Sequence, residues 1–146
     1  MIEQLREELE ADEGIKHEVY LDHLEKKTVG IGHLCQAGEP EYEMEVGEAV
    51  SEERVAELFE QDMAWTLKDC AALVPEFDEL PKEARLIIAN MMFNMGRSRL
   101  SGFKKFLAAI QAGAYSTAAD EMADSRWHSQ VPARSDRLIA RMRAVS

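Results

Sequence analysis

The segment between Pro81 and Gly96 places the tightest limit on what this chain can fold into. Its central stretch, ARLIIANMMFNM at residues 84–95, is apolar almost all the way round a helix. Such a helix lies at the centre of a group of other helices, because it has no polar side to turn towards water. Pro81 suits the first turn of this helix. We therefore predict a helical lobe built around this segment.

Helical periodicity continues on both sides of the central segment. Ile2, Leu5 and Leu9 lie three and four residues apart, which predicts a first amphipathic helix ended by Gly14. Ser51, followed by two glutamates, is typical of a helix start. The helical pattern that begins at Ser51 continues towards Val74 and Pro75. It predicts either one long helix or two abutting helices. Three more helices are expected, around residues 103–110, 118–123 and 132–142.

A different pattern lies between Val19 and His33. The short alternating pieces VYLD and TVGIGH, joined by the polar HLEKK, predict a small β-hairpin. Residues 35–50 have no clear period and are predicted to form a loop. The fold class is therefore α+β, mostly helical, with the strands segregated near the N-terminus.

Length and composition favour one compact domain. The 146 residues contain no repeat, low-complexity tract or linker. The first residues lack the pattern of a signal peptide, and no run approaches the roughly 18 to 20 apolar residues that a membrane span needs. We expect neither secretion by the general route nor stable membrane association. Cys35 and Cys70 match no metal or redox spacing, so free thiols are expected, and Cys70 is expected in the core.

The charge is strongly acidic. With 28 acidic and 17 basic residues the formal net charge is -11, which repels polyanions and disfavours binding to nucleic acid. The basic residues are unevenly distributed. Five arginines fall in the last 21 residues: Arg126, Arg134, Arg137, Arg141 and Arg143.

Glu13, Asp22 and Thr28 are the densest group of candidates for chemistry. Hydrolysis of a glycosidic bond needs one carboxyl group to protonate the leaving oxygen and a second to activate water or attack the sugar. Thr28, on the return strand, is placed to hold a water beside Asp22. Carboxylates at this spacing are also common by accident, and most acids in such a chain are solvated surface residues.

The same three residues carry a family resemblance. The string E-x8-D-x5-T, which closes on TVGIGHL, resembles the catalytic signature of the phage-type lysozymes, glycoside hydrolase family 24. Further segments resemble the family in the same order: FEQDM at 59–63, ANMMFNMG at 89–96, SGF at 101–103 and SRWHSQVPAR at 125–134. Residues 35–50 have no good match. The resemblance covers most of the chain.

The resemblance implies a bilobal lysozyme-like fold with the substrate in a cleft. A small lobe would comprise about residues 14–50 and a connecting helix about 51–72. The helical lobe would comprise about 73–146 together with the helix at 1–13. In family terms Glu13 would be the general acid and Asp22 the base. Asp22 and Thr28 would place the water that attacks with inversion at the anomeric carbon.

Three residues outside this signature are expected in the cleft. Arg134 matches the family arginine that pairs with the catalytic acid, although a solvated arginine at a helix start is the alternative. A cation beside Glu13 would lower the pKa of this residue, whereas a general acid needs a raised pKa. Apolar surroundings and the bound sugar are expected to compensate for the effect of the cation. Gln130 is a candidate for substrate binding. Asn90 is interpreted as a structural residue near the cleft.

His33 and Asp62 are expected to form a structural ion pair. Asp62 falls on an apolar helix face, where an unpaired carboxylate is costly, and pairing would raise the pKa of His33. A catalytic His33 is the alternative, but nothing nearby in the sequence supplies a nucleophile for it to serve. Trp127 is expected in the core of the helical lobe, with a sugar platform as the alternative.

The predicted function is a bacteriolytic lysozyme without metal or cofactor. It would cut the β-1,4 bond from N-acetylmuramic acid to N-acetylglucosamine in bacterial peptidoglycan, as a monomeric phage endolysin. It would stay in the host cytoplasm until a holin-type membrane-permeabilising protein releases it to the cell wall. A tail-associated or prophage-borne muramidase would use the same chemistry.

Two other functions stay open. One is a chitinase-like glycosidase, and the other is a non-catalytic wall-binding module of the same fold. The acidic charge fits an anionic substrate poorly, so we expect the arginines of the last 21 residues to form a local positive patch.

Overall fold

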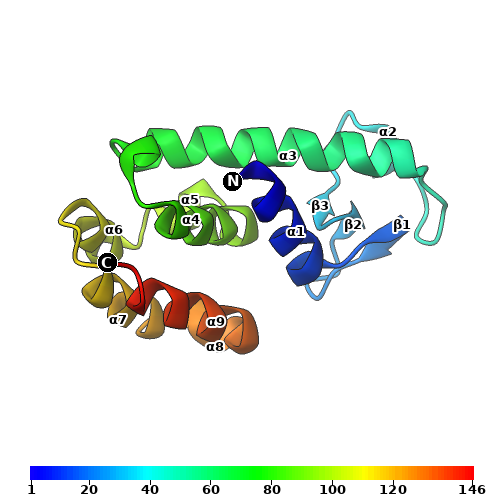
Figure 1. Cartoon of the computed structure of the whole chain (residues 1–146). Coiled ribbons are helices and arrows are strands. Elements are labelled where there is room, and N and C mark those ends of the chain that lie inside the picture. Colours follow the sequence, from blue (N-terminus) through cyan, green and yellow to red (C-terminus); the bar gives the residue numbers. More distant parts are fainter. The chain divides into compact units, whose positions relative to one another are not determined.

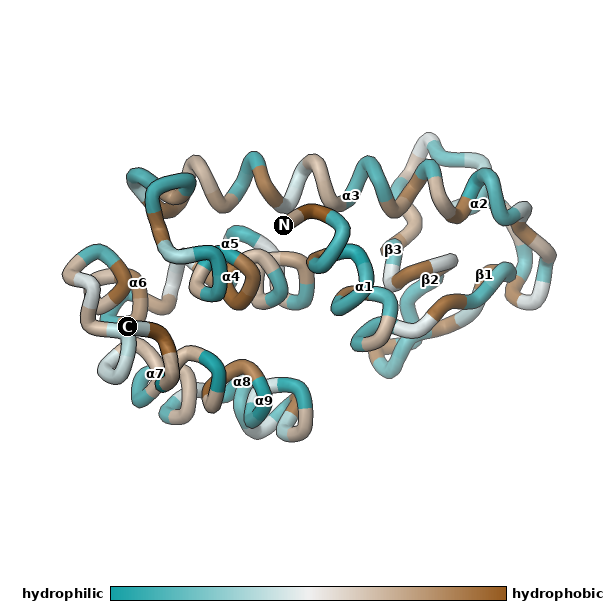
Figure 2. Tube along the Cα trace, viewed as in Figure 1, coloured by the Kyte–Doolittle hydropathy of each residue, from teal (hydrophilic) through white to brown (hydrophobic).

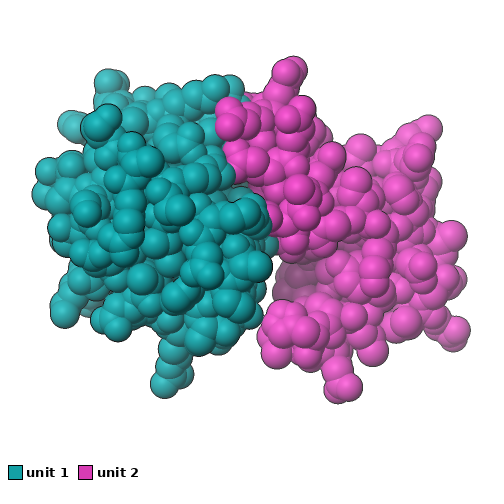
Figure 3. Space-filling model, turned by 60° about the horizontal axis from the view of Figure 1, so that its bottom comes forward, with its two compact units in different colours: residues 1, 66–146 teal, residues 2–65 magenta.

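The computed structural model describes residues 1–146 and divides into two compact units. The N-terminal unit comprises residues 2–65, and the C-terminal unit comprises Met1 and residues 66–146 (Figure 3). The division falls inside the longest helix, α3 (Glu52–Leu73). Nine α-helices and one three-stranded sheet confirm the predicted α+β class. The lobe boundaries implied by the family, and the packing of the first helix on the larger lobe, stay a prediction.

The N-terminal unit begins with α1 (Ile2–Glu13), which Gly14 ends as expected. Gly14 has a φ of 74°, and its N–H donates to the Glu10 carbonyl at 2.9 Å. A positive φ at the residue after a helix costs glycine little. Leu5 and Leu9, spaced for one face of the helix, are fully buried. The turn at Gly14 leads the chain directly into the sheet.

The sheet has three antiparallel strands in the order of the sequence: β1 (Lys16–Leu21), β2 (Lys27–Gly30) and β3 (His33–Leu34) (Figure 1). It is larger than the predicted hairpin, because residues after the GIG turn add a short third strand. Val19 pairs with Val29 and both are fully buried. The next pair, Tyr20 with Thr28, lies on the opposite face because side chains alternate along a strand.

The prediction of a loop over residues 35–50 is wrong at one point. A single helical turn, α2 (Pro40–Glu43), forms there. Four residues are too few to show a helical period in the sequence, and the turn is held by a distant partner. Glu41 is buried and accepts two hydrogen bonds from the Arg54 guanidinium, at 2.9 and 3.0 Å. The bond to Arg54 lowers the pKa of Glu41 against the opposing effect of burial.

The helical pattern after Ser51 forms one continuous helix, α3, rather than two. Ser51 caps it by accepting a hydrogen bond from the Arg54 N–H at 3.1 Å. Its buried residues Val55, Leu58 and Phe59 lie three and four positions apart, as the sequence predicts. Cys70, further along, is fully buried, and both cysteines are free thiols, which confirms that prediction.

The C-terminal unit is built around α4 (Lys82–Met95), as the apolar segment predicts. Residues Ala84, Leu86, Ile87, Ile88, Ala89, Asn90, Met91 and Met92 of α4 are buried. In the hydropathy colouring of Figure 2 this helix carries hydrophobic segments between hydrophilic ones. A short 3-10 turn at Phe77–Glu79 precedes it. The helix packs against α5 (Arg97–Leu100) and α9 (Pro132–Arg143).

The other helices complete a layer beside α9. These are α6 (Lys104–Gln111), α7 (Tyr115–Ala123) and α8 (Arg126–Gln130), and α7 packs against all of its neighbours α6, α8 and α9. The sequence predicts α6, α7 and α9 but neither α5 nor α8, which are too short for a periodic pattern. In the whole chain, no helix combines the length and the apolar character needed to cross a membrane.

Candidate active site

Glu13 is the last residue of α1, and its carboxylate lies against the backbone of Gly32. Gly32 has a φ of 65°, and a Cβ built on it would lie 2.6 Å from Glu13 Oε1. Any other residue at this position would push the carboxylate away, and would also be strained at this φ. Gly32 thus provides the space in which the half-buried Glu13 carboxylate is held.

Asp22 directly follows β1 and is fixed by the turn to β2. Its Oδ1 accepts hydrogen bonds from the Leu24 N–H at 2.8 Å and from the Lys26 N–H at 2.9 Å. The bond from Lys26 is the main reason that the pKa of Asp22 is lowered; desolvation opposes it, and the Leu24 bond lowers the pKa further. Asp22 is therefore an oriented carboxylate, ionised at neutral pH. Its Oδ2 lies outside these two backbone bonds.

Thr28 is buried on β2, and its hydroxyl has one defined role. Oγ1 donates to the Lys26 carbonyl at 3.0 Å, so its hydrogen is committed to the backbone. The lone pairs of Oγ1 are then left to accept a hydrogen bond. Lys26 thus links the two side chains, because its N–H binds Asp22 and its carbonyl binds Thr28.

Tyr20 lies beside these groups. It is the cross-strand partner of Thr28, and the Lys16 ammonium lies 4.3 Å from the centre of its ring. Burial raises the pKa of Tyr20, and the negative charges of Glu13 and Asp22 raise it further, with a smaller effect from Cys35. The phenol therefore stays protonated. Glu13 and Asp22 both lie within electrostatic range of this one side chain.

His33 and Asp62 are brought together, and Glu39 joins them. The His33 Nδ1 lies 2.7 Å from Asp62 Oδ2, and Nε2 lies 2.9 Å from Glu39 Oε1. Burial alone would lower the pKa of His33, but the hydrogen bonds to Asp62 and Glu39 outweigh it and raise the pKa to about 9. With both ring nitrogens engaged by carboxylates, the imidazolium ties β3 to α3 and to the start of α2.

Arg134 and Asn90 meet inside the C-terminal unit. The Arg134 Nε donates to Asn90 Oδ1 at 2.9 Å, and both residues are buried. A solvated arginine, the alternative at the sequence level, does not fit this burial. Gln130 is exposed instead, and its Oε1 accepts a hydrogen bond from Arg99. A role of these three residues in binding substrate stays a prediction.

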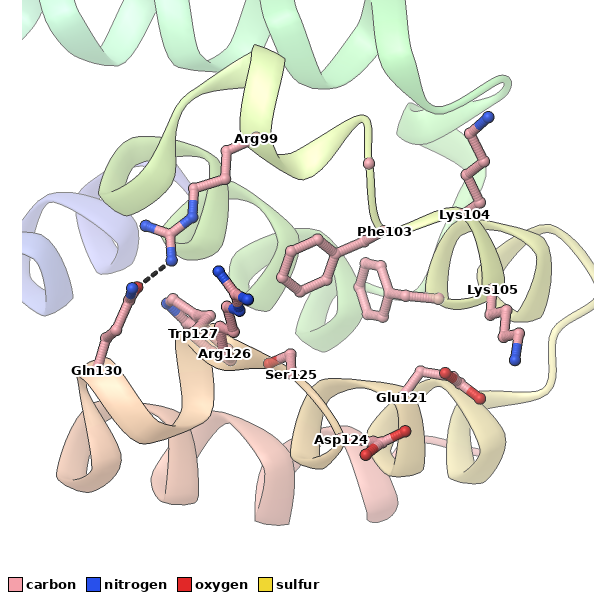
Figure 4. Close-up of a pocket in the computed structure, with 12 residues that line it drawn as sticks. Arg99, Phe103, Lys104, Lys105, Glu121, Asp124, Ser125, Arg126, Trp127 and Gln130 are labelled. Carbon is pink, nitrogen blue, oxygen red and sulfur yellow. Dashed lines mark hydrogen bonds between the residues drawn. The ribbon is translucent and has the colours of Figure 1, made fainter.

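Gln130 lines a cavity of about 610 Å³ within the C-terminal unit (Figure 4). Phe103 and Phe106 meet edge to face in its wall, with ring centres 6.4 Å apart. Around them lie the charged side chains Arg99, Lys104, Lys105, Glu121, Asp124 and Arg126. Trp127 also contributes to the wall but is 1% exposed, and its indole N–H donates to Asn94 Oδ1 at 2.7 Å. This confirms Trp127 as a core residue.

The arginines near the C-terminus do not act as one free positive patch. Arg141 is paired with Glu83, and Arg143 lies 2.5 Å from Asp120. Arg134 is buried, whereas Arg126 is exposed at the cavity. No group of three or more His, Cys, Asp and Glu side chains is arranged to hold a metal ion.

Comparison with known proteins assigns the family. The family model for phage lysozyme matches residues 10–144, so the chain belongs to the phage lysozyme family of glycoside hydrolases. This confirms the resemblance found in the sequence.

Individual relatives agree with this assignment. The chain is 32% identical to probable T4-type lysozyme 2 of Dictyostelium discoideum, over 96% of this chain and 94% of the relative. It is 28% identical to the pre-baseplate central spike protein Gp5 of Enterobacteria phage T4, over 92% of this chain but 26% of the relative. It is also 28% identical to peptidoglycan hydrolase gp36 of Pseudomonas phage phiKMV, over 94% of this chain and 15% of the relative.

Three contributors to the site are not identified from the sequence. Gly32 belongs to the GIG segment, which suggests a close approach of the strand to sugar or to another strand, but the structure places it against Glu13. The sequence around Glu39 shows no periodic pattern that would indicate a contact with His33. The sequence does not distinguish Tyr20 from an ordinary strand residue. Only the strand register places it opposite Thr28, and only the fold brings it within electrostatic range of Glu13 and Asp22.

Proposed function

We propose that this protein hydrolyses bacterial peptidoglycan, at the β-1,4 bond from N-acetylmuramic acid to N-acetylglucosamine, with inversion. The observation that carries the proposal is the joint placement of Asp22 and Thr28 by the two backbone groups of Lys26, in a member of the lysozyme family. The relative gp36, whose name states peptidoglycan hydrolase activity, supports the choice of substrate.

In this proposal Asp22 and Thr28 hold the attacking water. The water donates one hydrogen to Oδ2 of Asp22 and the other to Oγ1 of Thr28, which keeps its own hydrogen on the Lys26 carbonyl. Its lone pair then points to the anomeric carbon. As the bond forms, Asp22 takes the proton. Because Oδ1 is already bound by two amides, the carboxylate does not rotate away from this position.

Glu13 is the proposed general acid. It donates its proton to the glycosidic oxygen while water attacks from the opposite face of the sugar. Gly32 leaves the space that this carboxyl group occupies. Arg134 is proposed to support Glu13, and Asn90 is proposed to position Arg134 through the bond to its Nε. Gln130 is proposed to contact the substrate at the edge of its cavity.

The decisive experiment compares the fragments released from purified peptidoglycan by wild type, Glu13→Gln and Glu7→Gln. Glu7 is an exposed residue of the same helix and serves as the matched control. Mass analysis should show muramic acid at the new reducing ends for wild type and Glu7→Gln, and no product for a folded Glu13→Gln. Turnover by Glu13→Gln at the wild-type rate would refute its role as the acid.

Assays with the same purified peptidoglycan also distinguish the two alternative functions. Faster release of products from chitin oligomers than from peptidoglycan would indicate a chitinase-like enzyme. Binding to cell walls by wild type without any product would indicate a non-catalytic module.

The proposed biological role is lysis of a bacterial host at the end of phage infection. The protein would act as a monomer that waits in the cytoplasm for a holin-type partner. Expression in bacteria should leave cells intact until the inner membrane is permeabilised, and should then cause rapid lysis that Glu13→Gln does not cause. Lysis without permeabilisation would contradict this dependence.

A further inference from the structure

Tyr20 lies within electrostatic range of the two proposed reacting carboxylates, Glu13 and Asp22, and neither the sequence signature nor the family assignment gives it a role. The register pairs it directly with Thr28, so the two side chains lie on one face of the sheet. Asp22 is two residues further along, and its N–H donates to the Lys26 carbonyl at 2.9 Å, which continues the β1–β2 pairing. Tyr20, Asp22 and Thr28 therefore share this face.

The Tyr20 ring is in contact with the side chain of Lys16. The Lys16 ammonium lies 4.3 Å from the ring centre, a cation–π contact that fixes the ring against its own strand. The ring is half-buried, so its orientation is set before substrate arrives.

The charges around the phenol keep its proton in place. Burial, Glu13 at the end of α1, Asp22 after β1 and Cys35 after β3 all disfavour a phenolate, and the Lys16 ammonium is the cation over the ring. A neutral phenol is a hydrogen-bond donor. A donor beside two carboxylates stabilises whichever of them is charged.

We propose that Tyr20 is a positioning residue of the hydrolytic reaction, whose phenol O–H stabilises the negative charge as it passes from Asp22 to Glu13. Before reaction Asp22 is the carboxylate and Glu13 the acid. During reaction the proton of water goes to Asp22, and the proton of Glu13 goes to the leaving oxygen. The negative charge thus moves from Asp22 to Glu13, and both carboxylates lie within electrostatic range of Tyr20. The phenol changes its partner and keeps its own proton, so it takes no part in the proton balance.

This inference rests on the proposed roles of Glu13 and Asp22, and its test separates the two. Tyr20→Phe keeps the ring and its contact with Lys16 but removes the O–H. With soluble peptidoglycan strands as substrate, we expect kcat to fall about tenfold with little change in KM, which is the size expected for losing a hydrogen bond to a charged group. Both limbs of the pH–rate profile should move upward, because carboxylates without the donor are less acidic. Tyr115→Phe, in the C-terminal unit, is the control and should match wild type.

The outcomes distinguish a failure of the inference on Tyr20 from a failure of the proposed function. If wild type hydrolyses peptidoglycan and Tyr20→Phe has wild-type kcat and an unchanged pH profile, the inference on Tyr20 is wrong and the proposed function stands. A change in KM or in the free energy of unfolding alone would likewise make Tyr20 a packing residue. If wild type does not hydrolyse peptidoglycan, the proposed function fails, and the inference fails with it.

Discussion

The His33 imidazole Nδ1 lies 2.7 Å from Asp62 Oδ2, in a contact that joins the short strand β3 to α3. The histidine side chain is 6% exposed. A buried charge is costly unless it is paired, and here Glu39 supplies a second carboxylate on Nε2. Because two anions face it, His33 remains protonated well above neutral pH, with a pKa of about 9.

We expect Asp62→Asn to lower the free energy of unfolding by roughly 2 kcal/mol at pH 6, because the buried imidazolium loses one of its two partners. A raised histidine pKa contributes stability that is fully present below its ordinary value of 6.5 and is lost as pH rises through about 9. The difference between wild type and variant should therefore shrink between pH 6 and pH 10. Urea denaturation across this range, with NMR titration of His33, measures both effects.

The control for this prediction is Asp120→Asn. It removes the partner of Arg143 in an exposed ion pair, and such surface pairs contribute little to stability. Its effect should be small and independent of pH. An equal destabilisation by Asp62→Asn at pH 6 and pH 10 would contradict the assigned role of His33.

Gly32→Ala should impair hydrolysis far more than folding. The new Cβ would lie 2.6 Å from Glu13 Oε1, and the flexible carboxylate would move away at little cost. Backbone strain at a φ of 65° should cost roughly 1 kcal/mol of stability. A displaced acid should lower the rate about a hundredfold. Thermal unfolding and release of reducing ends measure the two effects.

Gly113→Ala provides the matched control for strain alone. Gly113 has a φ of 69° with nothing within 4 Å of the added Cβ. The Gly113→Ala variant should lose about as much stability as Gly32→Ala and should keep full activity. If the two variants had equal activity, contact between Gly32 and the acid would not matter for catalysis.

Asn94→Ala should destabilise the C-terminal unit by roughly 1 to 3 kcal/mol, because the buried Trp127 N–H loses its acceptor. Trp127→Phe removes the donor as well, so adding Asn94→Ala to it should cost much less than Asn94→Ala alone. A double-mutant cycle by urea denaturation gives the coupling between the two residues. Additive effects would show that the hydrogen bond contributes nothing.

Arg126→Gln should slow hydrolysis of intact cell walls a few-fold at low ionic strength, because Arg126 is an exposed cation in a strongly acidic protein. The effect should vanish as salt screens the charge. Arg143→Gln is the comparison, since its charge is already balanced by Asp120. Equal salt dependence of the two variants would exclude a special role for the cavity arginine.

Much of the fold follows from local patterns. The apolar stretch of α4, the spacing of Leu5 and Leu9 in α1 and the capping residue Ser51 each predict an element that the structure contains. These signals come from residues close together in the chain. The turn α2 does not show such a signal, because its buried Glu41 is held by Arg54 on another helix.

The candidate site divides in the same way. The order of Glu13, Asp22 and Thr28 is a property of the sequence, and together with four further segments it indicated the family. The sequence also placed Asp62 on an apolar face, where it needs a partner. The tertiary structure alone decided that Gly32 leaves space for Glu13, that Glu39 completes the surroundings of His33, and that Tyr20 lies opposite Thr28. Such contacts depend on strand register and on close approach between segments, and neither leaves a periodic trace in the chain.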